Sequence, residues 1–191
     1  RVFLKFDSGM HRLGFPLRQH AETLARVRAM PGVAGVTLMT HFAQADESAG
    51  VAWQLRPFLA ELAAYGLPWS SANSAALLRY PDTCGAWVRP GIMLYGTSPF
   101  AELSAEELGL RPAMHLESEL IGVQTLQPGE GVGYGQLFRA DRSMRVGIVA
   151  CGYADGYPRH APTGTPVAVC GQRARTLGRV SMDMLCVDLS D

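Results

Sequence analysis

Apolar and polar positions in the first half of the chain alternate between two periods. Short apolar runs rich in aromatic and β-branched residues predict strands at residues 2–7, 33–40, 67–71 and 86–88. Apolar residues at helical spacing predict helices at residues 17–30, 46–65 and 73–80. Strand and helix alternating in this way are typical of a parallel sheet covered by helices. Four such units would make half of an eight-fold barrel.

Two of the predicted helices carry clear start and stop signals. Asp46, Glu47 and Ser48 are expected to cap the middle helix, which Gly66 ends, and Asn73 is expected to cap the last one. The middle helix is expected to turn its large apolar residues inward: Trp53, Leu55, Phe58, Leu59 and Leu62.

The pattern changes near residue 110. Helical spacing gives way to alternation at 114–121, glycine turns follow at 128–131, and further strands are predicted at 145–150, 165–170 and 180–189. We therefore expect an α/β fold in two domains: the second half of a (β/α)8 TIM-type barrel at 1–111, then an all-β domain at 112–191.

Composition excludes several kinds of function. With 17 basic and 17 acidic residues the formal net charge is zero, so nothing points to nucleic acid or an anionic membrane. No apolar run approaches the about 20 residues needed to cross a bilayer. The four cysteines are scattered and the histidines isolated, which predicts neither a disulfide scaffold nor a metal site and favours a cytoplasmic location. The chain starts at Arg1 and ends just past a strand, so we expect it to be a piece of a longer protein.

Polar residues follow the predicted strands. Lys5, the only lysine, lies on a buried strand, where desolvation disfavours its charged form and makes the amine nucleophilic. It can form a Schiff base, act as a base, or be carbamylated by carbon dioxide into an anion that binds Arg12. The alternative is a strand-end lysine whose ammonium reaches solvent.

The remaining candidates also have two interpretations each. Asn73 and Ser74, with the backbone of Gly91 and Ile92, form either a phosphate site or ordinary helix caps. His41 is a general base or a hydrogen-bonded core histidine, and Arg89 meets a ligand ring or forms a surface ion pair.

The β domain adds two candidates. Tyr153, in a glycine-flanked loop, is an acid/base or a packed tyrosine of a turn. The backbone N–H of Met182 holds a carboxylate or belongs to a β-bulge.

These motifs, taken in order, resemble the pyridoxal-phosphate-dependent alanine racemases. The resemblance extends over most of the chain and is carried by seven short motifs: KFDSGMHRLG (5–14), THFA with Asp46 (40–46), ANSA (72–75), VRPGIMLYG (88–96), GVGYG (131–135), GYADG (152–156) and GRVSMD (178–183). The family implies pyridoxal 5'-phosphate as cofactor and alanine as substrate.

The resemblance implies a role for each candidate near the cofactor. Lys5 corresponds to the family's carbamylated lysine, whose anion orients Arg12 toward the cofactor phenolate and the substrate carboxylate. Arg89 meets the pyridine nitrogen, which then stays unprotonated because a guanidinium keeps its proton. The expected phosphate group lies beside Asn73 and is held by Ser74, Gly91 and Ile92.

Further implied roles concern the substrate and a second subunit. Tyr153 corresponds to the base on one face of the α-carbon and is linked through His41 to Arg89, while Met182 lies near the substrate carboxylate. Both serve the partner's cofactor, so a homodimer with shared active sites is implied. Asp46 and Arg179 resemble residues that line the entrance.

The family's Schiff-base lysine, which is also the second base, is expected upstream of Arg1. We therefore expect the full-length protein to racemise alanine, supplying D-alanine for peptidoglycan, and the 191-residue piece alone to be inactive. The alternatives are a broad-specificity racemase acting on serine or other amino acids, and a non-catalytic ligand-binding module.

Overall fold

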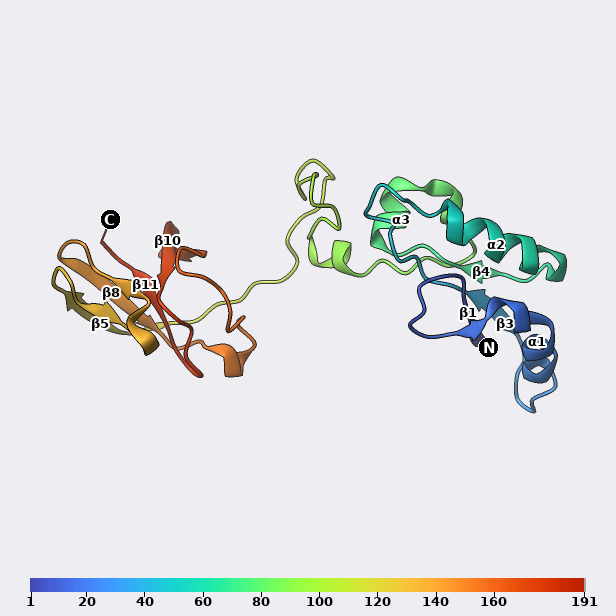
Figure 1. Cartoon of the computed structure of the whole chain (residues 1–191), viewed down its shortest axis with the longest axis horizontal. Helices are drawn as coiled ribbons and strands as arrows, with labels where there is room; N and C mark the ends of the chain where they lie inside the picture. The colour runs from blue at the N-terminus through green and yellow to red at the C-terminus, as the bar shows by residue number, and fades with distance from the viewer. Residues whose placement is uncertain (191) are drawn as a thin grey trace. The chain divides into compact units, whose positions relative to one another are not determined.

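The computed structural model describes residues 1–190 and divides the chain into two units. The first unit covers Arg1–His115 and the second begins at Leu116. Figure 1 shows the first as a sheet with helices and the second as a β structure. No helix within residues 1–190 combines the length and apolar character needed to cross a membrane.

The first unit is built on a parallel sheet. Its strands, in the order β2-β1-β3-β4, are β2 (Phe15–Pro16), β1 (Val2–Asp7), β3 (Val36–Met39) and β4 (Trp69–Ser70). The segment expected as the strand at 86–88 contributes only a parallel bridge from Trp87 to Ser70. All strands run the same way, so their carboxyl ends lie at one edge of the sheet.

Helical segments alternate with these strands, as the periodicity predicted. They are η1 (Leu17–Gln19), α1 (His20–Arg28), α2 (Ala52–Leu62), η2 (Ala63–Tyr65), α3 (Ser74–Arg79), η3 (Pro81–Thr83) and η4 (Ile92–Tyr95). Asn73 caps α3 as expected, since its side chain accepts a hydrogen bond from the Ala76 amide at 3.0 Å.

The main core of this unit lies between the sheet and helices α1 and α2. Leu4 and Phe6 point into it from β1, where they meet Leu24 of α1 and Phe58 of α2. Because side chains alternate along a strand, Lys5 is left on the opposite face of the sheet from Leu4 and Phe6.

Two expectations for the middle helix are wrong. It begins at Ala52 rather than after Asp46, because residues 44–50 form successive turns and Gly50 takes a left-handed φ of +64°. Trp53, expected to point inward, is 43% exposed, whereas the neighbouring Gln54 is fully buried. The inward face of α2 therefore carries a polar side chain that the apolar pattern did not predict.

The second unit is an antiparallel sheet. Its strands, in the order β5-β8-β11-β10-β9, are β5 (Leu120–Leu126), β8 (Met144–Val149), β11 (Leu185–Asp188), β10 (Gln172–Leu177) and β9 (Pro166–Val169). A small pair, β6 (Gly131–Val132) and β7 (Phe138–Arg139), and the turns η5 (Tyr134–Gln136) and η6 (Tyr153–Asp155) complete it.

Strand boundaries in this unit differ from the sequence expectations. Residues 114–119 alternate but are exposed and lie outside any strand, and the strand begins at Leu120. The strand expected at 180–189 is limited to β11, because a turn in which the Ser181 amide donates to the Met184 carbonyl precedes it. β10 was not predicted, because its two arginines interrupt the apolar pattern expected of a strand.

Phe58→Ala should destabilise the first unit strongly. The ring is fully buried between α2 and the sheet, and its removal would leave a cavity costing about 3–5 kcal/mol. Chemical denaturation of the full-length protein, followed by tryptophan fluorescence, measures the loss. Met30→Ala is the control, since Met30 is 51% exposed and its truncation should leave the midpoint nearly unchanged. Equal midpoints for the two variants would contradict this core.

Candidate functional site

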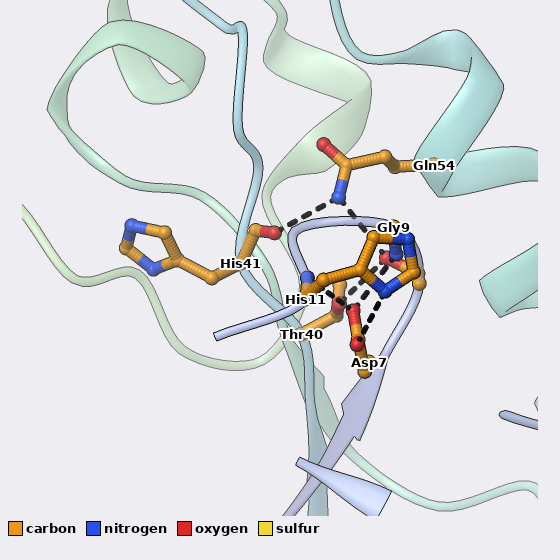
Figure 2. Close-up of polar contacts among 7 residues, drawn as sticks. Asp7, Gly9, His11, Thr40, His41 and Gln54 are labelled. Carbon is orange, nitrogen blue, oxygen red and sulfur yellow. Dashed lines mark hydrogen bonds and ion pairs between the residues drawn. The ribbon is translucent and has the colours of Figure 1, made fainter. Parts of the chain in front are cut away.

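The loop after β1 is held by the carboxylate of Asp7. Its Oδ1 accepts hydrogen bonds from the amides of Gly9 at 2.9 Å and His11 at 3.0 Å, and its Oδ2 lies 3.0 Å from His11 Nδ1 (Figure 2). Burial raises the pKa of Asp7, but the His11 and Gly9 amides and the His11 ring outweigh it and hold that pKa below its usual value. The loop is therefore a turn whose backbone is held by Asp7, and Arg12 directly follows it.

Glycine is required within this turn. Gly9 has φ of +134°, and a Cβ there would lie 2.3 Å from the ring of Trp53. Trp53 thus covers the turn instead of entering the core. Arg12 directly follows His11. It is exposed and makes no hydrogen bond or ion pair with the described residues.

Lys5 lies near two positively charged side chains, those of Arg12 and Arg89. Burial, then the charges of Arg12 and Arg89, lower the pKa of its amine, with Asp7 acting in the opposite direction. The uncharged amine is the form that reacts with electrophiles. The structure thus provides the less basic amine that the sequence suggested.

Arg89 donates hydrogen bonds to residues at the carboxyl ends of β3 and β4. Its Nη1 donates to Ser70 Oγ at 2.5 Å, and its Nη2 donates to the Thr40 carbonyl at 2.7 Å and lies 3.2 Å from His41 Nδ1. A longer contact of 3.4 Å reaches the Ser71 carbonyl. Its Nε–H has no acceptor among the described residues. This N–H and the second N–H of Nη1 are left for a ligand.

His41 is neutral and its tautomer is fixed. Because a guanidinium only donates, Nδ1 must accept from Arg89 and the proton must sit on Nε2. Burial, and then the charges of Arg89, Arg12 and Lys5, lower the pKa of His41 to about 4. The imidazole therefore presents an N–H donor at neutral pH.

Ser74 and the start of η4 form a small group of hydrogen-bond donors. The Ser74 hydroxyl oxygen accepts from the amides of Gly91 at 2.8 Å and Met93 at 3.4 Å, which leaves its proton for another acceptor. The Ile92 amide has no acceptor among the described residues. Asn73 lies alongside, but its side chain is occupied by the Ala76 amide and the Phe42 carbonyl, so it acts as a cap.

The donor set of this unit suits a phosphorylated pyridine ring. Arg12 and Arg89 supply positive charge, and the free Nε–H of Arg89 can donate to a ring nitrogen. The Ser74 hydroxyl and the Ile92 amide are donors for phosphate oxygens. Asp7, the nearby carboxylate, is turned into its own loop and does not oppose an anion there.

The second unit brings Tyr153 and Met182 together. The Tyr153 amide donates to the Ser181 carbonyl at 3.1 Å, and the Ala154 amide donates to the Met182 carbonyl at 2.9 Å. Gly152 permits this approach, since a Cβ there would lie 2.2 Å from the Met182 oxygen. The Met182 amide donates to none of the described residues, which leaves it for a ligand.

Two residues of interest were missed by sequence reasoning. The guanidinium of Arg159 lies 5.3 Å from the centre of the Tyr153 ring, a cation–π distance. Gln54 is buried beside His41, and only its position on an otherwise apolar helix face could have indicated it.

The entrance candidates Asp46 and Arg179 are each exposed. Within residues 1–190, no three His, Cys, Asp or Glu side chains gather as a metal site requires.

Comparison with known proteins gives consistent matches. The family described as "Alanine racemase, N-terminal domain" matches residues 1–99, and "Alanine racemase, C-terminal domain" matches residues 113–191. A protein named alanine racemase from Thiobacillus denitrificans is 77% identical over 190 residues, covering 100% of this chain and 52% of the relative. One from Nitrosospira multiformis is 60% identical, covering 100% of this chain and 54% of the relative.

Solved structures agree. The biosynthetic alanine racemase from Pseudomonas aeruginosa superposes with a TM-score of 0.90 at 54% identity, over 99% of this chain and 53% of that one. The alanine racemase from Acinetobacter baumannii gives a TM-score of 0.86 at 37% identity, over 100% of this chain and 54% of that one. This likeness confirms the expected fold class, a half-barrel followed by a β domain. The chain spans about half the length of the relatives it matches.

The pKa of His41 should lie far below that of an ordinary histidine. Nitrogen-15 NMR of the full-length protein should show midpoint protonation at about pH 4 instead of 6.5. Because folding lowers this pKa, the unfolded chain binds the proton more readily. The stability contributed by neutral His41 is therefore complete above pH 6.5 and is lost as the pH falls toward about 4.

Arg89→Gln provides the check on the cause. Removing the guanidinium charge should raise the pKa of His41, since that charge follows burial as the second cause of the depression. A wild-type midpoint near 6.5, or no rise in the variant, would contradict the contact between these side chains.

Proposed function

Because the chain belongs to the alanine racemase family, we propose that the full-length protein interconverts L-alanine and D-alanine with pyridoxal 5'-phosphate as its cofactor. D-Alanine made in this way would supply peptidoglycan synthesis. The observation that carries the proposal is the Arg89–His41 contact, which leaves an N–H on each side chain directed at no described acceptor. The free thiols of all four cysteines favour a reducing, cytoplasmic location.

The first unit would hold the cofactor. Arg89 would donate its Nε–H to the pyridine nitrogen, while Ser74, Gly91 and Ile92 would hold the phosphate. Arg12 would contact the cofactor phenolate and the substrate carboxylate. When bound, pyridoxal 5'-phosphate supplies a ring that accepts electron density from the α-carbon. A guanidinium keeps its proton, so Arg89 would leave the ring nitrogen unprotonated and limit side reactions.

Tyr153 would move the proton on one face of the substrate. Its phenolate oxygen would take the α-proton of one enantiomer, or its phenol would return a proton in the reverse direction. His41 Nε2–H would donate to that oxygen, with Nδ1 held by Arg89. Met182 would bind the substrate carboxylate through its amide. The lysine that the family carries upstream of this segment would serve the opposite face.

Tyr153 and Met182 would act in the active site of a partner subunit. The two residues share one loop cluster in the β unit, and the cofactor residues lie in the other unit. The full-length protein would then be a homodimer with shared active sites. Asp46 and Arg179 would then line the entrance from different units.

Lys5 would be carbamylated in the resting enzyme. Its neutral amine would add to carbon dioxide, forming the N–C bond and releasing one proton to water, and the product is an anion. The charges of Arg12 and Arg89 that lower the pKa of the amine would stabilise that anion. The carbamate would hold the exposed Arg12 guanidinium in place.

Racemisation by the full-length protein tests the function. With pyridoxal 5'-phosphate and L-alanine, D-alanine should accumulate until the two enantiomers are equal. Tyr153→Phe should lower kcat by about 100-fold or more, because it removes a proton-transfer group.

Arg173→Gln, an exposed arginine on β10, serves as the control and should racemise normally. Absence of D-alanine from the intact protein would reject the proposal, and faster turnover of serine than alanine would favour the broad-specificity alternative. Binding of the cofactor with no turnover of any amino acid would favour a non-catalytic module.

Carbamylation should be visible by carbon-13 NMR. Full-length protein equilibrated with labelled bicarbonate should give a carbamate signal that Lys5→Ala lacks. Arg12→Met should weaken the signal, since the anion loses a guanidinium that also lowers the pKa of the amine. Identical spectra for wild type and Lys5→Ala would show that the lysine stays a free amine.

A further inference from the structure

We propose that Gln54, a residue of α2 that would touch neither substrate nor cofactor, is a positioning residue that fixes the backbone of His41 at the end of β3. The inference rests on the proposed function, in which His41 acts between Arg89 and Tyr153. The inference adds Gln54, a residue of α2, to the proposed site.

Gln54 is fully buried and bonded at both ends of its amide. Oε1 accepts from the Ala43 amide at 2.7 Å. Nε2 donates to the His41 carbonyl at 3.1 Å (Figure 2). One side chain therefore clamps the backbone on both sides of Phe42, directly after the strand.

These two partners fix which way the amide points. A flipped amide would set its NH₂ against the Ala43 N–H and its oxygen against the His41 carbonyl, and both contacts would be repulsive. The site thus requires one acceptor and one donor. An apolar residue, which the pattern of α2 would favour, would leave a backbone N–H and a carbonyl without partners.

A second, weaker contact extends the clamp to the loop after β1. Gln54 Nε2 lies 3.5 Å from Ser8 Oγ, which in turn is 2.7 Å from Thr40 Oγ1. The Thr40 carbonyl accepts from Arg89. Gln54 is therefore connected to both residues of the Arg89–His41 contact through Thr40 and His41.

The imidazole depends on this backbone for its place. His41 Nδ1 accepts from Arg89 at 3.2 Å, already at the long end of a hydrogen bond, so a small shift of the His41 backbone would break it. Displacements of about 1 Å are enough to slow a positioned reaction by about 100-fold. Loss of the clamp should therefore reduce turnover without removing a group that touches substrate.

Three variants of the full-length protein test the assignment. Gln54→Met keeps the length of the side chain but removes both hydrogen bonds. In Gln54→Glu the protonated acid can still accept from Ala43 and donate to His41, whereas the carboxylate has no proton to donate. Gln19→Glu makes the same chemical change at an exposed position and is the control.

Turnover and the protonation of His41 are measured together. Gln54→Met should lower kcat by about 10-fold to 100-fold with KM for alanine nearly unchanged. Nitrogen-15 NMR should show a raised pKa of His41 in this variant, because the imidazole moves away from Arg89 and toward water. Gln19→Glu should match wild type in both measurements.

The pH profile separates positioning from packing. Relative to wild type, Gln54→Glu should be close to fully active at the acid end of a range from about pH 5 to about pH 10 and approach Gln54→Met at the alkaline end. A flat ratio, or an unchanged pKa of His41 in Gln54→Met, would overturn the inference even if both variants melt earlier. If wild type itself does not racemise alanine, the proposed function fails, while the NMR comparison still tests the clamp.

Discussion

The cation of Arg89 is the constraint on which the arrangement of the first unit depends. It is partly buried, burial lowers its pKa, and no carboxylate of the described residues pairs with it. Its charge is instead met by neutral acceptors: Ser70, the carbonyls of Thr40 and Ser71, and His41. A buried cation must be satisfied in this way, so the loops that follow β3 and β4 are held in one geometry. Burial, and after it this charge, lower the pKa of His41 to about 4, so that the imidazole is neutral at neutral pH.

The parallel sheet positions the other residues of the proposed site. Because β1, β3 and β4 run in the same direction, the residues after them meet at one edge. Lys5 and Arg12 come from the first strand and its loop, His41 from the second, and Ser74 from the helix after the third. A core packed on the other face of the sheet leaves these groups free for chemistry. The core thus packs on one face of these strands, while the residues of the proposed site lie on the other face or beyond the carboxyl ends.

Much of this could be predicted from the sequence, and the failures have physical causes. Alternating periods predicted the strand–helix order and the β unit, because burial imposes those periods. Trp53 was placed in the core because size and apolarity suggested it, but the turn at Gly9 uses its ring as a cover. Gln54 and Arg159 were missed because each is marked by a side-chain contact, with His41 and Tyr153 respectively, that an apolar pattern does not carry. β10, QRARTL, was missed because its polar residues outnumber its apolar ones and leave no apolar alternation to detect.

The central claim is that groups from separate strand ends form one cofactor site around Arg89. A crystal structure of the full-length protein with pyridoxal 5'-phosphate tests it most directly. The account predicts the pyridine nitrogen against the Arg89 guanidinium, with the phosphate against Ser74 and the backbone of Gly91 and Ile92. A cofactor bound elsewhere, with Arg89 still turned only toward Ser70, Thr40 and His41, would contradict it.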